Sequence, residues 1–242
     1  LIDLIVVSLT ILLGAGLGRL LKMDRDTALL TSIGSSICGA AAVLGAEPVV
    51  KSKPYKAAVA VSTVVIFGTL SMFLYPALYR AGMLNLTTEQ MGLFTGATLH
   101  EVAHVVGAGN AMGQAISDPA IIVKMIRVMM LAPVLVILSI ILARRDSAAG
   151  GNSEKRKITI PWFAFLFLAV IGFNSLHLLP AELVDAINTL DTFLLTMAMT
   201  ALGTESSFEK FKKAGARPFL LAGLLYVWLF FGGYWLVKLI SF

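Results

Sequence analysis

The sequence predicts an all-α, multi-pass membrane protein that contains inverted repeats and two interrupted or re-entrant helical segments. Of its 242 residues, 58% are hydrophobic and 14% are charged, whereas an ordinary soluble domain has about 45–50% apolar and about 25% charged residues. The mean hydropathy is +0.88, and the apolar residues form blocks of about 20, enough for a helix to cross a hydrocarbon core about 30 Å thick. Two further blocks are rich in glycine and alanine and carry polar residues at their centres.

Six blocks are long and apolar enough to form spanning helices, because a backbone in lipid must satisfy its own hydrogen bonds. They are Leu4 to Leu21, Ala57 to Tyr79, Pro119 to Ala143, Ile160 to Leu179, Ala186 to Gly203 and Pro218 to Ile240. We expect all six in a single transmembrane domain that covers residues 1–242. The chain starts on Leu1 inside an apolar block, without an initiator methionine or the features of a signal peptide, so we expect further helices upstream.

The two segments with polar centres, residues 27–50 and 91–113, resemble each other. With Gly34 aligned to Gly96, they read GSSICGAAAVLGA and GATLHEVAHVVGA, which share five identities in 13 positions. Small residues are common in all tightly packed membrane helices, which offers a purely compositional explanation. The glycine spacing and the polar positions agree together, however, and this agreement favours an internal repeat.

The distribution of lysine and arginine predicts how the chain is oriented in the membrane. The most basic loops, 143–157 and 209–217, and the short loops 22–26 and 51–56 are all expected in the cytoplasm. Since the two short loops flank segment 27–50, this segment is expected to enter and leave on one side as a re-entrant hairpin. Segment 91–113 is then a hairpin from the opposite side, which makes the repeats inverted, as in many secondary transporters. Broken helices that cross the whole membrane are the alternative.

The second segment contains the letters HEVAH, which match the HExxH motif of zinc peptidases. A zinc site of this kind needs His100 and His104 on one helical face as metal ligands, and Glu101 beside them to polarise a bound water. In the extended motif a third histidine completes the zinc shell, but the residue here is Asn110, a poor zinc ligand. Asp191 is then the best remaining candidate for a third ligand in the hydrolase hypothesis.

The rest of the sequence favours another explanation of HEVAH. Glu205 is the next candidate for a third ligand, and the remaining histidine, His177, lies near the outer end of a distant span. The first segment has Cys38, Gly39 and Ala42 where the second has His, Glu and His. A transporter explains both segments and a zinc hydrolase explains one. We therefore expect no enzyme, no catalytic residue and no metal or other cofactor, and we keep an intramembrane zinc hydrolase as the alternative.

Polar and ionisable residues within the membrane indicate a functional site, because burying them there is costly. We expect His100, Glu101 and His104 to couple transport to a proton or a sodium ion, since a histidine beside a carboxylate titrates near neutral pH. At the tips of the two segments, backbone amides and small polar side chains are expected to bind an anion. These substrate-binding residues are Gly34, Ser35, Ser36, Cys38, Gly39, Gly96 and Thr98. The alternative is that both sets only pack helices together.

Other polar residues are secondary candidates for the site, and Asn110 is one of them. Lys124 and Arg127 are three apart and so lie on one helical face, where they add positive charge to an anion path or extend to the lipid headgroups. Asp191, Thr196 and Thr200 belong to a polar stripe that lines a pathway, unless the threonine hydroxyls only bond the preceding turn.

The charge and the cysteine content limit the classes of binding partner that the sequence favours. The net charge of +5 comes from short basic runs between apolar blocks, which indicates membrane topology rather than nucleic-acid binding. The single cysteine, Cys38, excludes an internal disulfide. We expect the partners to be the lipid bilayer, a small inorganic or organic anion and a coupling proton or sodium ion. The sequence permits a homo-oligomer without requiring one.

Five segments carry a resemblance to a known family. In chain order they are GSSICGAAAVLGAEPVVK, TVVIFGTLSMFLYPALY, TLHEVAHVVGAG, KMIRVMMLAPVL and KITIPWFAFLF. They resemble the sulfate exporter family of YeiH-type bacterial inner-membrane proteins over nearly the whole chain. The resemblance implies a fold related to the cation/proton antiporters and bile-acid symporters, and export of a small anion such as sulfate or a sulfonate. A membrane sensor or assembly subunit without transport is a further alternative.

Overall fold

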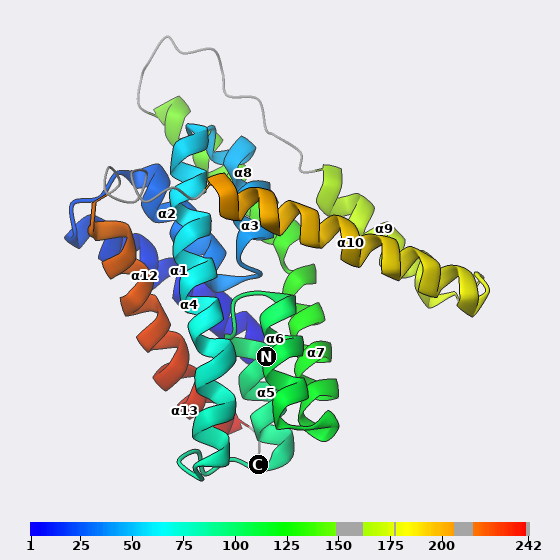
Figure 1. The fold of residues 1–242 in the computed structure, drawn as a ribbon. Coiled ribbons are helices and arrows are strands. Elements are labelled where there is room, and N and C mark those ends of the chain that lie inside the picture. Colours follow the sequence, from blue (N-terminus) through cyan, green and yellow to red (C-terminus); the bar gives the residue numbers. More distant parts are fainter. Residues whose placement is uncertain (149–161, 177, 206–214, 241–242) are drawn as a thin grey trace.

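Figure 1 shows the fold in a computed structural model, which describes residues 1–148, 162–176, 178–205 and 215–240. All regular elements in these ranges are helices. They are α1 (Ile2–Leu20), α2 (Arg25–Ser36), α3 (Ala40–Val50), α4 (Pro54–Arg80), α5 (Thr88–Thr98), α6 (Val102–Met112), α7 (Gln114–Met129), α8 (Leu131–Ala148), α9 (Trp162–Ser175), α10 (Ala181–Glu205), α12 (Arg217–Val227), the π-helical turn η1 (Trp228–Gly232) and α13 (Gly233–Ile240). His177 and most of the basic loops 143–157 and 209–217 lie outside the described residues.

Four helical stretches in the described ranges are long and apolar enough to cross a membrane. They are Ile2–Leu20, Pro54–Arg80, Gln114–Arg144 and Arg217–Ile240. These stretches match four of the six predicted spans, and the all-helical membrane class is confirmed. The predicted spans Ile160 to Leu179 and Ala186 to Gly203 form α9 and α10 but are not among the four. The described part of α9 has only 14 residues, and threonines and Asp191 dilute the apolar character of α10.

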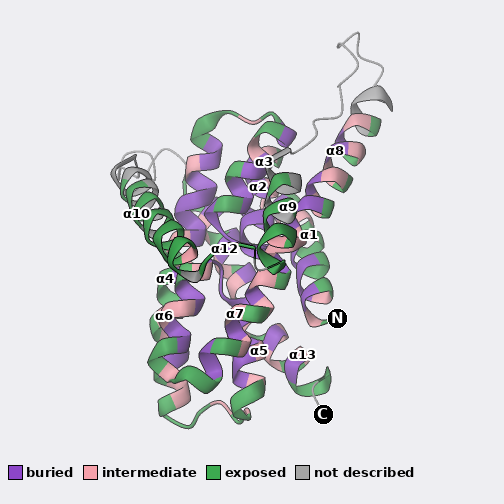
Figure 2. Ribbon diagram, turned by 90° about the vertical axis from the view of Figure 1, so that its right-hand side faces the viewer, coloured by how far each residue is buried: buried purple, intermediate pink, exposed green. Residues whose placement is uncertain are grey.

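Helices α9 and α10 project from the side of the helical bundle (Figure 1). Most of the α10 side chains that the structure describes are exposed, as the green colour of this helix shows in Figure 2. The buried residues concentrate instead around α2, α3, α4, α5 and α7. The candidate site must therefore be sought inside this bundle.

The stretch predicted as one span from Pro119 to Ala143 is divided at Met130 into α7 and α8. Pro133 explains the division, because proline has no backbone N–H to donate to the carbonyl four residues earlier and its ring crowds that carbonyl. The break allows the two halves to pack differently. Helix α7 packs against α5 and α6, whereas α8 packs against α3.

Helices α2 and α3 reverse direction at residues 37–39, so that their outer ends lie at the same end of the bundle (Figure 1). In the first turn of α4, the Lys56 Nζ lies 2.7 Å from a carboxylate oxygen of Asp24 and 2.7 Å from one of Asp26. Since α4 follows α3 after three residues, these contacts hold the start of α2 beside the end of α3. Burial raises the pKa of Asp24, but hydrogen bonds from Lys56 and Thr27 outweigh it and leave that pKa below its usual value.

Helices α5 and α6 form a second reversal, at residues 99–101. Arg80, the last residue of α4, donates a 2.7 Å hydrogen bond to the carbonyl of Ala111 near the end of α6. Helix α5 begins a few residues after Arg80, at a capping box in which Thr87 and Gln90 bond each other's backbone N–H groups. The start of α5 and the end of α6 therefore also lie together.

The two helix pairs open toward opposite ends of the bundle. Helix α4 joins them, and its 27 residues give it a length of about 40 Å. Each pair has its own apolar core, with Ile33, Val43 and Leu135 in one and Phe94, Val105 and Ile116 in the other. Both reversals are buried in the middle of the molecule, where they face each other.

Candidate functional site

The two reversals meet around two basic side chains of α7, and both side chains are fully buried. Lys124 and Arg127 are each 0% exposed, and their donors point at main-chain carbonyls. The ends of α2 and α5 lie at this point, and a helix C-terminus carries unpaired carbonyls and a partial negative charge. The two cations of α7 thus compensate the partial negative charges at the ends of α2 and α5.

Lys124 joins the two reversals, residues 37–39 and residues 99–101, which we call the two breaks. Its Nζ donates to the carbonyls of Ile37 at 2.8 Å, Leu99 at 2.7 Å and His100 at 2.7 Å. An ammonium group has three donors, and these three carbonyls use all of them. The first carbonyl belongs to one break and the other two belong to the second break.

Arg127 makes a parallel set of bonds one turn later. Its Nε donates to the Ser36 carbonyl at 2.7 Å and its Nη1 donates to the Ala97 carbonyl at 2.6 Å. Longer contacts reach the carbonyls of Ser35 and Leu99. The two side chains do lie on one helical face, as their spacing predicts, but they do not extend to lipid headgroups as one interpretation of the sequence required.

An acidic side chain lies at the opposite kind of helix end. The Oε1 atom of Glu101 accepts a 3.1 Å hydrogen bond from the backbone N–H of Ala40, the first residue of α3. A helix N-terminus carries unpaired N–H groups and a partial positive charge. Glu101, which lies between α5 and α6, therefore compensates the charge at the start of α3. Glu101 is 5% exposed.

Gly39 makes this approach feasible. Its backbone has φ 70° and ψ −129°, a combination that side chains disfavour, and a Cβ at this position would clash with the Cγ of Glu101. The glycine predicted from the sequence to expose backbone amides therefore makes room for a carboxylate instead.

Gly39→Ala is expected to destabilise the protein by about 1–3 kcal/mol, the usual cost of a strained backbone conformation, and to displace Glu101 from α3. Gly82→Ala is the matched control, because Gly82 also has a positive φ, 66°, but has open space around it. Thermal denaturation of the purified variants measures the difference. An equal loss in both variants would contradict the clash with Glu101.

The two histidines lie beside Glu101 but differ in their contacts. The Nδ1 of His104 is 3.8 Å from the Oε2 of Glu101, and its Nε2 is 3.4 Å from the hydroxyl of Thr69. His100 is 1% exposed, and neither of its ring nitrogens has a hydrogen-bond partner. His104 fits against α4 because Gly68 has no side chain there. His100, Glu101 and His104 are thus brought together, as predicted.

The HEVAH motif does not have the geometry that a zinc peptidase needs. Helix α6 begins at Val102, so that only His104 is helical and His100 and Glu101 lie in the break. Leu99, with ψ 150°, is already extended. The i, i+4 face that the hydrolase hypothesis requires is therefore absent at this motif. In the parts of the chain that the structure describes, no three His, Cys, Asp or Glu residues are grouped to hold a metal ion.

The predicted anion-binding residues all lie at or near the breaks, but several already have other contacts. The Ser36 hydroxyl donates to the Ile33 carbonyl, and the Thr98 hydroxyl bonds the Phe94 carbonyl and the Tyr75 hydroxyl. Ser35 differs, because its Oγ is buried without a partner. Cys38 is buried at the first tip. Gly34 packs against Val43 of α3, and Gly96 packs against α7.

The remaining secondary candidates lie away from the two breaks. Asn110, near the end of α6, accepts a 2.9 Å hydrogen bond from Ser117 of α7. Asp191, Thr196 and Thr200 are exposed on α10, which projects from the bundle, and the Thr200 hydroxyl donates to the Thr196 carbonyl. This kind of bond to the preceding turn is the alternative that the sequence offered to a stripe that lines a pathway.

Sequence reasoning missed three polar residues around the breaks. Asp3, in the first turn of α1, is 9% exposed, interacts electrostatically with the charges of Lys124 and Arg127, and has an Oδ1 without a partner. Tyr75 bonds Thr98, and the ring of Tyr226 lies 6.5 Å from that of His100. An acidic residue at the edge of an apolar block was the available signal for Asp3.

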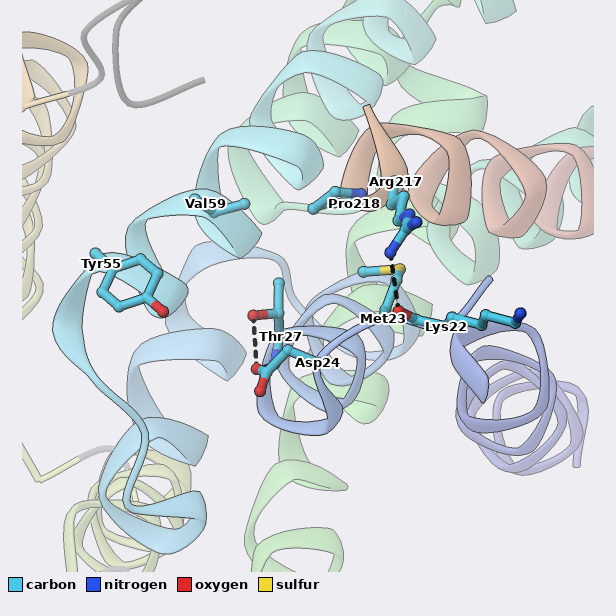
Figure 3. A pocket seen from close by; sticks show the side chains of 8 residues that line it. All are labelled: Lys22, Met23, Asp24, Thr27, Tyr55, Val59, Arg217 and Pro218. Carbon is cyan, nitrogen blue, oxygen red and sulfur yellow. Dashed lines mark hydrogen bonds between the residues drawn. The ribbon is translucent and has the colours of Figure 1, made fainter. Parts of the chain in front are cut away.

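A separate open pocket of about 230 Å³ lies at the end of the bundle where α1 ends and α2, α4 and α12 begin (Figure 3). Arg217 donates to the Lys22 carbonyl there, and Thr27 donates to Asp24. Helix α2 has 12 residues, so this pocket lies about 18 Å from the break. It is distinct from the buried site.

Comparisons with known proteins assign the chain to a class of bacterial membrane proteins. The chain is 68% identical over 242 residues to a UPF0324 membrane protein of Bacteroides thetaiotaomicron, covering 100% of this chain and 72% of the relative. It is 52% identical over 234 residues to the UPF0324 inner membrane protein YeiH of Escherichia coli K12, covering 96% of this chain and 66% of that relative. This is a multi-pass protein of the bacterial inner membrane.

The family follows from a sequence profile. The profile of the family described as Conserved hypothetical protein 698 matches residues 1–222, and the chain belongs to this family. The relatives from Bacteroides thetaiotaomicron and Escherichia coli are both longer than the chain. No solved structure matches the chain.

Proposed function

We propose that this protein is a secondary transporter that exports a small anion, with sulfate or a sulfonate as its substrate class. The observation that carries the proposal is the meeting of two helix breaks around buried Lys124, Arg127 and Glu101. Interrupted helices whose ends meet inside a membrane domain are a common way to build a substrate site. The direction of transport and the sulfur oxyanion class come from the family that the five quoted segments resemble.

The unsatisfied polar atoms support a site rather than a packing cluster. A permanently packed cluster would pair its buried polar atoms, because each one left unpaired costs about 1–3 kcal/mol. The ring nitrogens of His100, the Nδ1 of His104 and the Oγ of Ser35 have no partners. A substrate or a transported ion that enters the breaks would supply the missing hydrogen-bond partners.

The coupling proposal rests on Glu101 and the histidines next to it. The Oε1 atom of Glu101 accepts a hydrogen bond from the N-terminus of α3, and a carboxylate would hold this helix more strongly than a neutral Glu101, since a charged acceptor makes the stronger bond. A change in the charge of Glu101 therefore changes the relation between the two breaks. We propose that a proton, or alternatively a sodium ion, drives transport through this change.

In the membrane, we propose that the α2–α3 and α5–α6 pairs are re-entrant hairpins that enter from opposite sides and form inverted repeats. The common outer ends within each pair support this topology. Lys53→Cys, in the loop before α4, should react with an impermeant maleimide only from the cytoplasmic side, and Asn85→Cys, before α5, only from the periplasmic side. Reaction of both cysteines from one side would contradict the topology.

Uptake by proteoliposomes tests the transport function. The full-length protein is reconstituted, and entry of ³⁵S-sulfate is followed with and without a pH or sodium gradient, beside protein-free liposomes. We expect saturable uptake that a gradient accelerates. If sulfate, methanesulfonate and taurine all enter no faster than in protein-free liposomes, the proposed substrate class is wrong.

A further inference from the structure

We propose that the Glu101 carboxylate is a tethered competitor of the substrate: it occupies the anion site at the N-terminus of α3, and the substrate binds when this carboxylate leaves. The inference rests on the proposed function and deepens it. It assigns Glu101 the place of the substrate anion, rather than a place beside it.

The Glu101 carboxyl group lies where a bound anion would lie. The Glu101 Oε1 takes the Ala40 N–H, 61 residues earlier in the chain, which is the donor that a bound oxyanion would use at this helix. Helix α3 has 11 residues, enough for aligned peptide dipoles. An intramolecular anion therefore already fills the site that sequence analysis predicted for an external one.

His104 carries an unpaired ring nitrogen that faces the same carboxylate and is a donor in the tautomer that holds its proton there. The His104 Nδ1 is buried without a partner and lies 3.8 Å from the Glu101 Oε2, which is too far for a hydrogen bond. A planar carboxylate fixed at α3 does not reach it. A tetrahedral oxyanion directs its oxygens toward more donors at once, so it can bond the amide and the imidazole together.

Two glycines provide the space that the Glu101 and His104 side chains occupy. A Cβ on Gly39 would fill the place of the Glu101 side chain, and a Cβ on Gly68 would fill the place of the His104 ring. Both missing side chains border the same small region between the first break and α4. The space that the Glu101 carboxylate occupies becomes available to a substrate oxyanion once Glu101 withdraws.

The charges around Glu101 also favour binding of a single anion at this place. The ionisable groups that interact electrostatically with Glu101 are Lys124 and Cys38, and His104 faces its second oxygen. Lys124 uses its donors on carbonyls, so its charge attracts an anion without forming a new bond. Two anions side by side would repel each other, and this repulsion makes the carboxylate and the substrate alternatives.

Equilibrium binding of ³⁵S-sulfate to the detergent-purified, full-length protein at one fixed pH tests the inference. The variants are Glu101→Ala, which removes the competitor, and Glu101→Gln, which removes its charge. Glu89→Gln is the matched control, because Glu89 is exposed in the first turn of the adjacent helix α5. A thermal denaturation curve establishes that each variant is folded.

We expect Glu101→Ala to bind sulfate at least about tenfold more tightly than the wild type, because one competing charge-assisted hydrogen bond is lost. Glu101→Gln should also bind more tightly, and Glu89→Gln should bind like the wild type. If the wild type binds sulfate but the folded Glu101→Gln variant binds equally or more weakly, the competitor inference is overturned and the anion site stands. If no protein binds sulfate or methanesulfonate, the proposed substrate class falls and the inference falls with it.

Discussion

Arg127→Met should lose about 2–6 kcal/mol of stability, one of the largest losses that we expect from a single substitution in this chain. The substitution leaves the carbonyls of Ser36 and Ala97 at the two helix ends without their donors, and each unsatisfied buried carbonyl costs about 1–3 kcal/mol. The expected observations are a low yield of folded protein and a much lower midpoint of thermal denaturation in detergent.

Arg80→Met is the matched control for this prediction. Arg80 also donates to a carbonyl, that of Ala111, but it is exposed and water can replace it. We expect its stability to stay within about 0.5 kcal/mol of the wild type. If Arg127→Met were as stable as Arg80→Met, Arg127 would not hold the two breaks together.

Glu101→Gln should reduce gradient-driven sulfate uptake in proteoliposomes by about 100-fold or more, a loss typical of removing a proton-transferring side chain. Glutamine is close in shape and can still accept from Ala40, so the protein should remain folded, but it cannot exchange a proton. Together with tighter sulfate binding, this result would separate substrate binding from coupling. Full gradient-driven uptake by the folded variant would remove Glu101 from the coupling mechanism, whereas Glu89→Gln should transport normally.

Local sequence features predicted where the helices are interrupted. Polar residues and glycines mark the centres of segments 27–50 and 91–113, and the structure ends α2 at Ser36 and α5 at Thr98. The clustering of His100, Glu101 and His104 was also predictable, because they are adjacent in the sequence. These features depend on neighbouring residues, and local patterns encode such relations well.

The partners of the charged residues could not be predicted, because they lie far along the chain. Arg127 bonds the Ser36 carbonyl 91 residues away, and Glu101 bonds the Ala40 amide 61 residues away. Main-chain groups are present at every residue, so no side-chain pattern identifies the ones that a distant cation will meet. Sequence reasoning therefore left the role of Lys124 and Arg127 open between an anion path and headgroup contacts.

The HEVAH motif and the six predicted spans show a second limit. The sequence places His100 and His104 four residues apart, but the extended backbone of Glu101, with φ −119° and ψ 156°, shows that they do not share a helix. The predicted span Ala186 to Gly203 forms α10, whose threonines and Asp191 dilute its apolar character, and α10 projects from the bundle. Its position outside the bundle depends on tertiary packing, which hydropathy does not encode.

Protection of Cys38 by the substrate tests the central claim that the two breaks form the transport site. Cys38 is the only cysteine of this sequence and is buried in the first break. Its rate of alkylation by N-ethylmaleimide is measured in proteoliposomes with increasing sulfate, beside a cysteine placed at the exposed Met83. If the two breaks form the transport site, sulfate slows alkylation of Cys38 in a saturable way and leaves the rate at position 83 unchanged. An unchanged rate at Cys38, at sulfate concentrations that saturate uptake, would contradict this claim.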